Sequence, residues 1–167
     1  MAHGDLSRLG PRHLLSGGHE WADVDPVRRV VRLLHDRYRS ALTIITGREF
    51  GADLVARDVA DELIRRDPMV RLAVHDTRPT QHDFAGVTGV RCYHGRRDDG
   101  ECPVALRRRN HEMLTEERPD AVWVFHEDLR RSRTTQDLVS RSLKAGLPVF
   151  LNGVFHDQRA AVQERLF

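Results

Sequence analysis

Polar side chains follow each of the five short apolar runs in this sequence of 167 residues, and three of these turns contain glycine. These polar turns occupy residues 16–21, 46–51, 75–76, 126–128 and 152–153. Glycine lets a ligand approach the backbone closely, and a helix that begins at such a turn presents free N–H groups and the positive end of its dipole. A single turn of this kind is common where no ligand binds. Their occurrence after successive strands instead predicts an anion-binding site at one edge of a sheet.

Arginine supplies nearly all of the positive charge, since Lys144 is the only lysine among 27 basic residues. Arginines cluster at residues 107–109 and 130–133, next to polar turns. A guanidinium group can hold a phosphate at two points, so the clusters are interpreted either as solvated faces or as an anion clamp completed by hydroxyl groups. The 25 acidic residues leave a net charge of +2, and 6% of the residues are aromatic. This composition argues against nucleic-acid binding through bulk charge or a long stacking groove.

Three histidines, His19, His75 and His126, follow predicted strands, where imidazoles can serve as metal ligands or as acid–base groups. Because the chain has ten histidines, such placement also arises by chance. We therefore expect one of them to contact a ligand, and we expect no metal site. Cys92 and Cys102 match no zinc-binding spacing. The sequence contains neither a G-x-G-x-x-G fingerprint nor a Walker A motif, so no cofactor is predicted.

The apolar runs have the character of strands buried on both faces, being short, continuous and rich in β-branched and aromatic residues. They lie at residues 14–15, 41–46, 70–74, 121–125 and 148–151. Amphipathic helical patterns separate them. The first follows Asp25 and Pro26 and places Val27, Val30, Val31 and Leu34 on one face. The second follows Gly51, the third covers residues 104–117, and the fourth begins at Thr134, which forms a capping box with Asp137. This alternation predicts an α/β fold, a Rossmann-like three-layer domain with a mainly parallel sheet.

A single domain over residues 12–153 is expected, with a tail at residues 1–11 and a helical C-terminal tail at residues 154–167. Residues 75–103 form a long segment rich in Gly, Pro, Asp and Arg, in which residues 89–94 fit one more short strand. The sequence has no run of ~18 apolar residues and no signal-peptide core at its start, so a cytoplasmic protein is expected.

The order of the polar motifs resembles the SLOG superfamily, the Rossmann-like group that includes the LOG phosphoribohydrolases and the DNA-processing protein DprA. The small YspA-like (YpsA-related) branch is the most similar, and the resemblance extends over residues 12–152. It depends on two glycine-containing turns, an Arg-Asn-x-x-Met motif, a Pro-Asp pair before a strand, the position of a Gly-Thr pair, and a closing Ala-Gly-Leu-Pro-Val segment. Here these are residues 17–21 (GGHEW), 47–53 (GREFGAD), 109–113 (RNHEM), 119–120 (PD), 134–135 (TT) and 145–149 (AGLPV).

The resemblance implies a nucleotide-like ligand at the carboxyl edge of the sheet. Backbone N–H groups near the glycines would contact its phosphate or ribose, two arginines would neutralise its charge, and Trp21 or Phe50 would stack on its base. Asp53 is interpreted either as a contact or as a cap of the helix after Gly51. The implied contact residues are Gly17, Gly18, His19, Trp21, Gly47, Arg48, Asp53, Arg109, Asn110, Arg133, Thr134 and Thr135.

The sequence also departs from the family. The last glycine-rich turn has lost its glycines, His19 replaces an arginine, and Leu138 stands where LOG enzymes carry the glutamate used to cleave an N-glycosidic bond. Because leucine cannot act as an acid or base, we expect binding, for sensing or sequestration, of a phosphate-bearing, nucleotide-derived molecule, and we assign no catalytic residue. The alternative is a nucleotide hydrolase that cleaves the N-glycosidic bond, with Glu49, Asp53, Glu112 or Glu127 as acid or base.

Relatives in this superfamily imply two further expectations. SLOG domains of this kind are linked with signalling nucleotides and with conflicts between bacteria and phages, a setting carried over by analogy alone. They commonly pair through helices beside the pocket, which implies a homodimer or larger oligomer here. The apolar contacts would come from Leu33, Leu34, Tyr38, Phe155 and Phe167.

Overall fold

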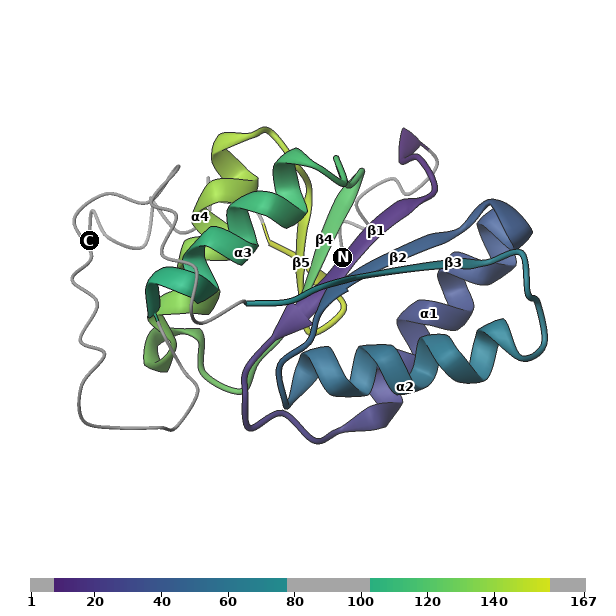
Figure 1. Cartoon of the computed structure of the whole chain (residues 1–167), viewed down its shortest axis with the longest axis horizontal. Helices are drawn as coiled ribbons and strands as arrows, with labels where there is room; N and C mark the ends of the chain where they lie inside the picture. The colour runs from purple at the N-terminus through teal and green to yellow at the C-terminus, as the bar shows by residue number, and fades with distance from the viewer. Residues whose placement is uncertain (1–7, 78–102, 157–167) are drawn as a thin grey trace.

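A computed structural model describes residues 8–77 and 103–156 and shows an α/β fold with a six-stranded sheet (Figure 1). The strand order is β3-β2-β1-β4-β5-β6, and all neighbours are parallel except β5 and β6. The strands are β1 (Arg12–Gly17), β2 (Thr43–Gly47), β3 (Arg71–His75), β4 (Ala121–Phe125), β5 (Val149–Leu151) and β6 (Val154–Phe155). The helices are α1 (Val24–Tyr38), α2 (Ala52–Ile64), α3 (Pro103–Thr115) and α4 (Arg133–Lys144), with 3-10 turns η2 (Arg39–Ala41) and η3 (Leu129–Arg131). The predicted Rossmann-like, mainly parallel architecture is confirmed.

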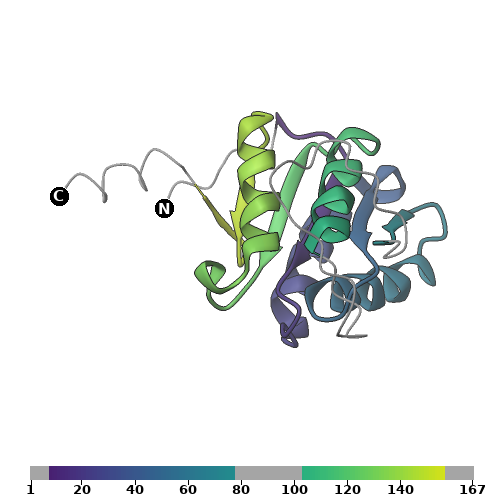
Figure 2. The same cartoon turned by 60° about the vertical axis from the view of Figure 1, so that its left-hand side comes forward.

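The helices cover the two faces of the sheet in pairs (Figures 1 and 2). Side chains alternate across each strand, so neighbours such as Leu14 and Leu15 enter different cores. Leu15 packs in a cluster with the buried faces of α1 and α2, whereas Leu14 packs with Met113 of α3 and Leu138 of α4. These two apolar layers hold the strands parallel and bring their carboxyl ends to one edge.

The strand order changes direction at β1. The chain passes from β1 through α1 to β2 on one side, and it later returns through α3 to β4 on the other side. The turns after β1 and β4 therefore diverge from neighbouring strand ends. In open α/β sheets a crevice forms at this topological switch point.

Two helix starts differ from the predicted positions. Asp23 caps α1, since its side chain accepts a hydrogen bond from the Asp25 N–H group, and the helix begins at Val24. Ser132 caps α4 by accepting from the Thr135 N–H group, so the predicted capping box at Thr134 is wrong. A serine two positions earlier provides the oxygen acceptor because the helix already begins at Arg133.

β6 was not predicted. It pairs antiparallel with β5 after a turn at Asn152 and Gly153, both at positive φ, and it extends the sheet two residues past the expected boundary at residue 153. Only Val154 and Phe155 form this edge strand, a length too short to show period-2 patterning. The predicted strand at 89–94, Cys92, Cys102 and the part of the predicted helical tail beyond residue 156, including Phe167, lie outside the described residues.

Of the side chains expected to join two copies of the chain, Leu34 does not fit that role because it is buried in the core beneath α1. Tyr38 donates its hydroxyl to the backbone oxygen of Leu9 and packs on the same core. Leu33 and Phe155 are exposed. Association between copies stays a prediction. Among the described residues, no helix is both long enough and apolar enough to cross a membrane.

His13 is a buried titratable group in the middle of the sheet. The indole N–H of Trp123 donates to His13 Nδ1 over 3.1 Å, and burial lowers the pKa of His13 from 6.5 to about 4. The folded state therefore resists protonation while the unfolded chain accepts a proton at its ordinary pKa.

We expect acid to destabilise the fold through His13. The folded pKa lies below the unfolded one, so the contribution is fully present above pH 6.5, is lost as the pH falls from 6.5 to about 4, and levels off below that. At 1.36 kcal/mol per pKa unit the loss is about 3 kcal/mol. Urea unfolding at several pH values measures it. His13→Asn, whose amide oxygen can still accept from Trp123, should flatten this dependence, whereas the control His111→Asn on α3 should keep it. An unchanged profile in His13→Asn would contradict the assignment.

Candidate functional site

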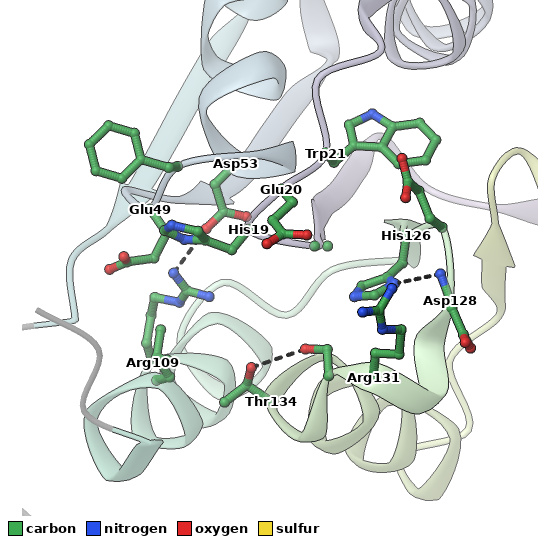
Figure 3. A pocket seen from close by; sticks show the side chains of 16 residues that line it. His19, Glu20, Trp21, Glu49, Asp53, Arg109, His126, Asp128, Arg131 and Thr134 are labelled. Carbon is green, nitrogen blue, oxygen red and sulfur yellow. Dashed lines mark hydrogen bonds and ion pairs between the residues drawn. The ribbon is translucent and has the colours of Figure 1, made fainter. Parts of the chain in front are cut away.

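A cleft of about 340 Å³ opens at the carboxyl edge of the sheet, over the ends of β1 and β4 (Figure 3). Its walls come from the turn after β1, the turn between β2 and α2, the side of α3, and the turn that leads from β4 into α4. The lining residues are Gly17, Gly18, His19, Glu20, Trp21, Glu49, Phe50, Asp53, Leu106, Arg109, His126, Glu127, Asp128, Arg131, Ser132 and Thr134.

A buried ion pair forms one end of this cleft. Arg109 Nη1 of α3 lies 2.9 Å from Asp53 Oδ2 of α2, and Ser16 of β1 donates its hydroxyl to the other carboxylate oxygen. The Asp53 and Arg109 side chains are 3% and 7% exposed. Of the two interpretations of Asp53, the helix cap is wrong, because Gly51 is the N-cap residue and the carboxylate bonds to Ser16 and Arg109. The pair joins helices that lie on opposite faces of the sheet.

Gly47 leaves room for this ion pair between α2 and α3. It ends β2 directly between the two helices, and a Cβ atom there would overlap with the carboxylate of Asp53 and the guanidinium of Arg109. The sequence pattern singled out Gly47 as a backbone contact for a ligand. In the structure its missing side chain gives room to the ion pair.

Removing one member of the pair should destabilise the protein strongly, because a buried carboxylate is then left without its cation. We expect Arg109→Met to lower the free energy of unfolding by about 3–5 kcal/mol in urea titrations. The matched control is Arg48→Met, because Arg48 pairs with Asp76 at 3.6 Å on the surface. An exposed pair of that kind contributes at most about 1 kcal/mol. Equal effects of the two substitutions would show that the Asp53–Arg109 pair does not stabilise the fold.

The turn after β1 is held by its own backbone. The Gly18 N–H group donates to the Phe125 oxygen of β4 over 2.8 Å, and the Gly18 oxygen accepts from the N–H groups of Trp21 and Ala52. A Cβ atom at Gly17 would overlap with the Phe125 oxygen. The glycines thus allow close approach between two turns, and the Gly18 N–H group is already occupied.

The remaining predicted contacts divide into two sets. His19, Trp21 and Thr134 line the cleft with the glycines of the first turn, Asp53 and Arg109. Five others do not line it. Gly47 lies beneath the ion pair and Arg48 on the surface. Arg133 is exposed. Asn110 donates to the Thr134 oxygen and to Asp137, and Thr135 donates to the Gly17 oxygen over 3.4 Å, so both of these support the walls from behind.

Several lining residues were not among the predicted contacts. They come mainly from the turn after β4, where the family resemblance directed attention to the Gly-Thr position rather than to the residues before it. The sequence did carry a signal, because this turn is polar, is followed by the arginine cluster at residues 130–133, and would neighbour β1 in a Rossmann-like order. These residues are Glu20, Glu49, Leu106, His126, Glu127, Asp128, Arg131 and Ser132, whereas Phe50, which also lines the cleft, was expected to stack on a base.

Charges in the cleft are unevenly distributed. Glu20, Glu49 and Glu127 bring carboxylates to the walls, and Glu49 accepts a hydrogen bond from Thr77. Asp128 is bound by the side chain of Arg130, whose hydrogen bonds hold the pKa of Asp128 below its usual value. Arg131 forms no ion pair with another described residue, and it points from below into the gap beneath the first turn (Figure 3).

The three histidines that follow strands do not converge. The His19 ring packs edge-on against Phe50, with centroids 5.7 Å apart, and His75 Nε2 lies 2.9 Å from a carboxylate oxygen of Glu117. His126 lines the cleft and accepts a hydrogen bond from the Asp128 N–H group. Within residues 8–77 and 103–156, no cluster of three or more His, Cys, Asp or Glu side chains is arranged to hold a metal ion.

The fold and the position of the cleft define a Rossmann-like α/β protein with a cleft at the switch point of the sheet. Compared with known proteins, the sequence matches no protein-family model and no curated protein.

Proposed function

We propose that this chain binds a small nucleotide-derived molecule that carries a phosphate, in the cleft at the carboxyl edge of the sheet, and senses or sequesters it without turning it over. The observation that carries the proposal is the meeting of this cleft with the N-terminus of α4 and the side chain of Arg131. The SLOG resemblance of the sequence favours the same ligand class.

The N-terminus of α4 suits the phosphate end of such a ligand. The first N–H groups of an α-helix, here those of Arg133 and Thr134, have no acceptor within the helix. Ser132 and Thr134 bring hydroxyl groups to the same wall, and Arg131 adds a positive charge. Arg109 contributes less charge than expected from the sequence, because Asp53 neutralises it within the protein. Helix dipole, amides and one guanidinium together favour an anion at this position.

The opposite wall suits the nucleoside end. Phe50 is 68% exposed, so one face of its ring is open to stacking. Trp21 is less suited, because its indole N–H donates to the Asp23 oxygen and its ring packs on Phe125. Glu20 and Glu49 are acceptors for ribose hydroxyls or for amino groups of a base. Placing the phosphate at α4 also keeps it away from these carboxylates.

The positions of the candidate acids and bases favour binding without turnover. Leu138 is packed in the core and offers no proton-transfer group. Asp53 is paired with Arg109, and Glu112 pairs with Arg108 without lining the cleft. Glu49 and Glu127 do line the cleft, and this observation favours the second candidate function, a hydrolase that cleaves an N-glycosidic bond.

The proposal is tested by titrating the protein with the four ribonucleoside 5′-monophosphates in a calorimeter. We expect at least one to bind, with affinity that falls as salt rises. Arg131→Gln should weaken binding by about tenfold, since it removes a charged donor to the phosphate. The control Arg130→Gln should change affinity by no more than about twofold, because Arg130 bonds to Asp128 and does not line the cleft.

Two outcomes would contradict the proposal. If none of the four monophosphates binds, the ligand class is wrong. If chromatography of the same mixtures shows free base accumulating over many turnovers, the protein is a hydrolase and the second candidate replaces simple binding.

A further inference from the structure

His126 occupies a central position in the cleft wall. It follows β4 directly, and Figure 3 shows its ring between the first turn and the side chain of Arg131. In the sequence, His126 is one of several histidines near a strand end, and neither the family resemblance nor its spacing distinguishes it from the others. Its hydrogen bonds distinguish it.

A backbone hydrogen bond fixes the tautomer of the neutral His126 ring, that is, which of its two nitrogens carries the proton. The Asp128 N–H group donates to His126 Nδ1 over 3.0 Å, so Nδ1 must present its lone pair. In a neutral imidazole the proton then resides on Nε2. Among the described residues Nε2 has no hydrogen-bond partner. His126 therefore offers the cleft a donor.

The backbone of His126 is fixed just as tightly. The Asn152 side chain accepts from the His126 N–H group and donates to the His126 oxygen, each over 2.9 Å. The primary amide of Asn152 supplies both the donor and the acceptor. Asn152 itself has a φ of 49°, a left-handed conformation that asparagine tolerates. The turn after β5 thus sets the position of the turn after β4.

Gly18 fixes the space that the ring occupies. A Cβ atom at Gly18 would lie 2.8 Å from His126 Cδ2 and 3.1 Å from Nε2. The ring consequently packs directly over the backbone of the first turn, beside the switch point of the sheet.

We infer that His126 is a specificity-determining residue of the cleft, whose Nε2–H group donates to an acceptor oxygen of the bound molecule. This inference rests on the proposed function and refines it: the acceptor is a phosphoryl oxygen of the nucleotide held at the N-terminus of α4. A ligand that presents only donor groups at this point is rejected, because the fixed ring cannot turn Nδ1 toward it. Asn152 acts as a positioning residue through the backbone of His126.

The first test needs no ligand. In protein labelled with ¹⁵N at histidine, long-range ¹H–¹⁵N correlation spectra near neutral pH should show a protonated Nε2 and an unprotonated Nδ1 for His126. The variant Asn152→Gly keeps the backbone conformation but removes both hydrogen bonds to His126, and it should shift the ring to a mixture of tautomers. A proton on Nδ1 in the wild-type protein overturns the inference, whether or not nucleotides bind.

The second test uses a matched pair of substitutions and the four ribonucleoside 5′-monophosphates. The amide of Asn reaches the position of Nδ1 and that of Gln reaches Nε2, so His126→Asn loses the donor to the ligand while His126→Gln keeps one. We expect His126→Asn to weaken monophosphate binding by about tenfold or more, and His126→Gln by no more than about threefold. Binding of the parent nucleosides, which lack the phosphate, should differ little between the two variants.

The outcomes separate the two proposals. If monophosphates bind the wild-type protein and His126→Asn equally well, the role of His126 is wrong and the proposed function survives. If no monophosphate binds the wild-type protein, the proposed function fails and the role of His126 fails with it. Circular dichroism confirms that each variant is folded before its affinity is compared.

Discussion

A carboxylate buried beneath the cleft imposes a condition on everything around it, because a charge removed from water needs a close counter-ion and hydrogen-bond donors. Asp53 meets that condition with Arg109 from the opposite helical layer and with the hydroxyl of Ser16. The pair crosses the end of β2 where Gly47 leaves space. As a result β1, α2 and α3 are joined at the edge of the sheet where the cleft opens, and the relative position of its walls depends on this contact.

The same edge shows how backbone groups are divided between structure and recognition. The first turn uses its Gly18 amide to bind the Phe125 oxygen, which fastens the turns after β1 and β4 to one another. Open N–H groups are instead found at the start of α4, where Ser132 caps the helix beside Arg131. The side of the cleft suited to an anion is therefore the side that follows β4. Glu20 and Glu49 lie on the other walls, while on the side that follows β4 the carboxylate of Asp128 is bound by Arg130. The cleft therefore favours a ligand with a negative end at α4 and a neutral, hydroxyl-bearing end.

Much of the fold could be predicted, because buried strands and amphipathic helices leave periodic patterns along the chain. Val27, Val30, Val31 and Leu34 face the core as their spacing indicates. The failures have local causes. β6 is too short for a period to show, and the cap of α4 depends on which of several neighbouring hydroxyls meets the Thr135 amide. The contacts of the side chains in the candidate site were harder to predict. The sequence pattern indicates which turns meet, but it does not indicate which of their polar atoms already bond to other groups of the protein. Arg109 and Gly47 were expected to contact a ligand. In the structure Arg109 is paired with Asp53, and Gly47 provides the space for that pair.

What the sequence determined by itself was the alternation of strands and helices and the edge at which polar turns collect, because both follow from short-range periodicity and from the direction of parallel strands. Tertiary structure alone decided that Arg109 would be neutralised by Asp53, that the Gly18 amide would be occupied, and that Asn152 would position His126. Those three contacts join residues 26 to 107 positions apart in the chain. Their partners are fixed by the packing of separate layers and turns, so no local pattern in the sequence reports them.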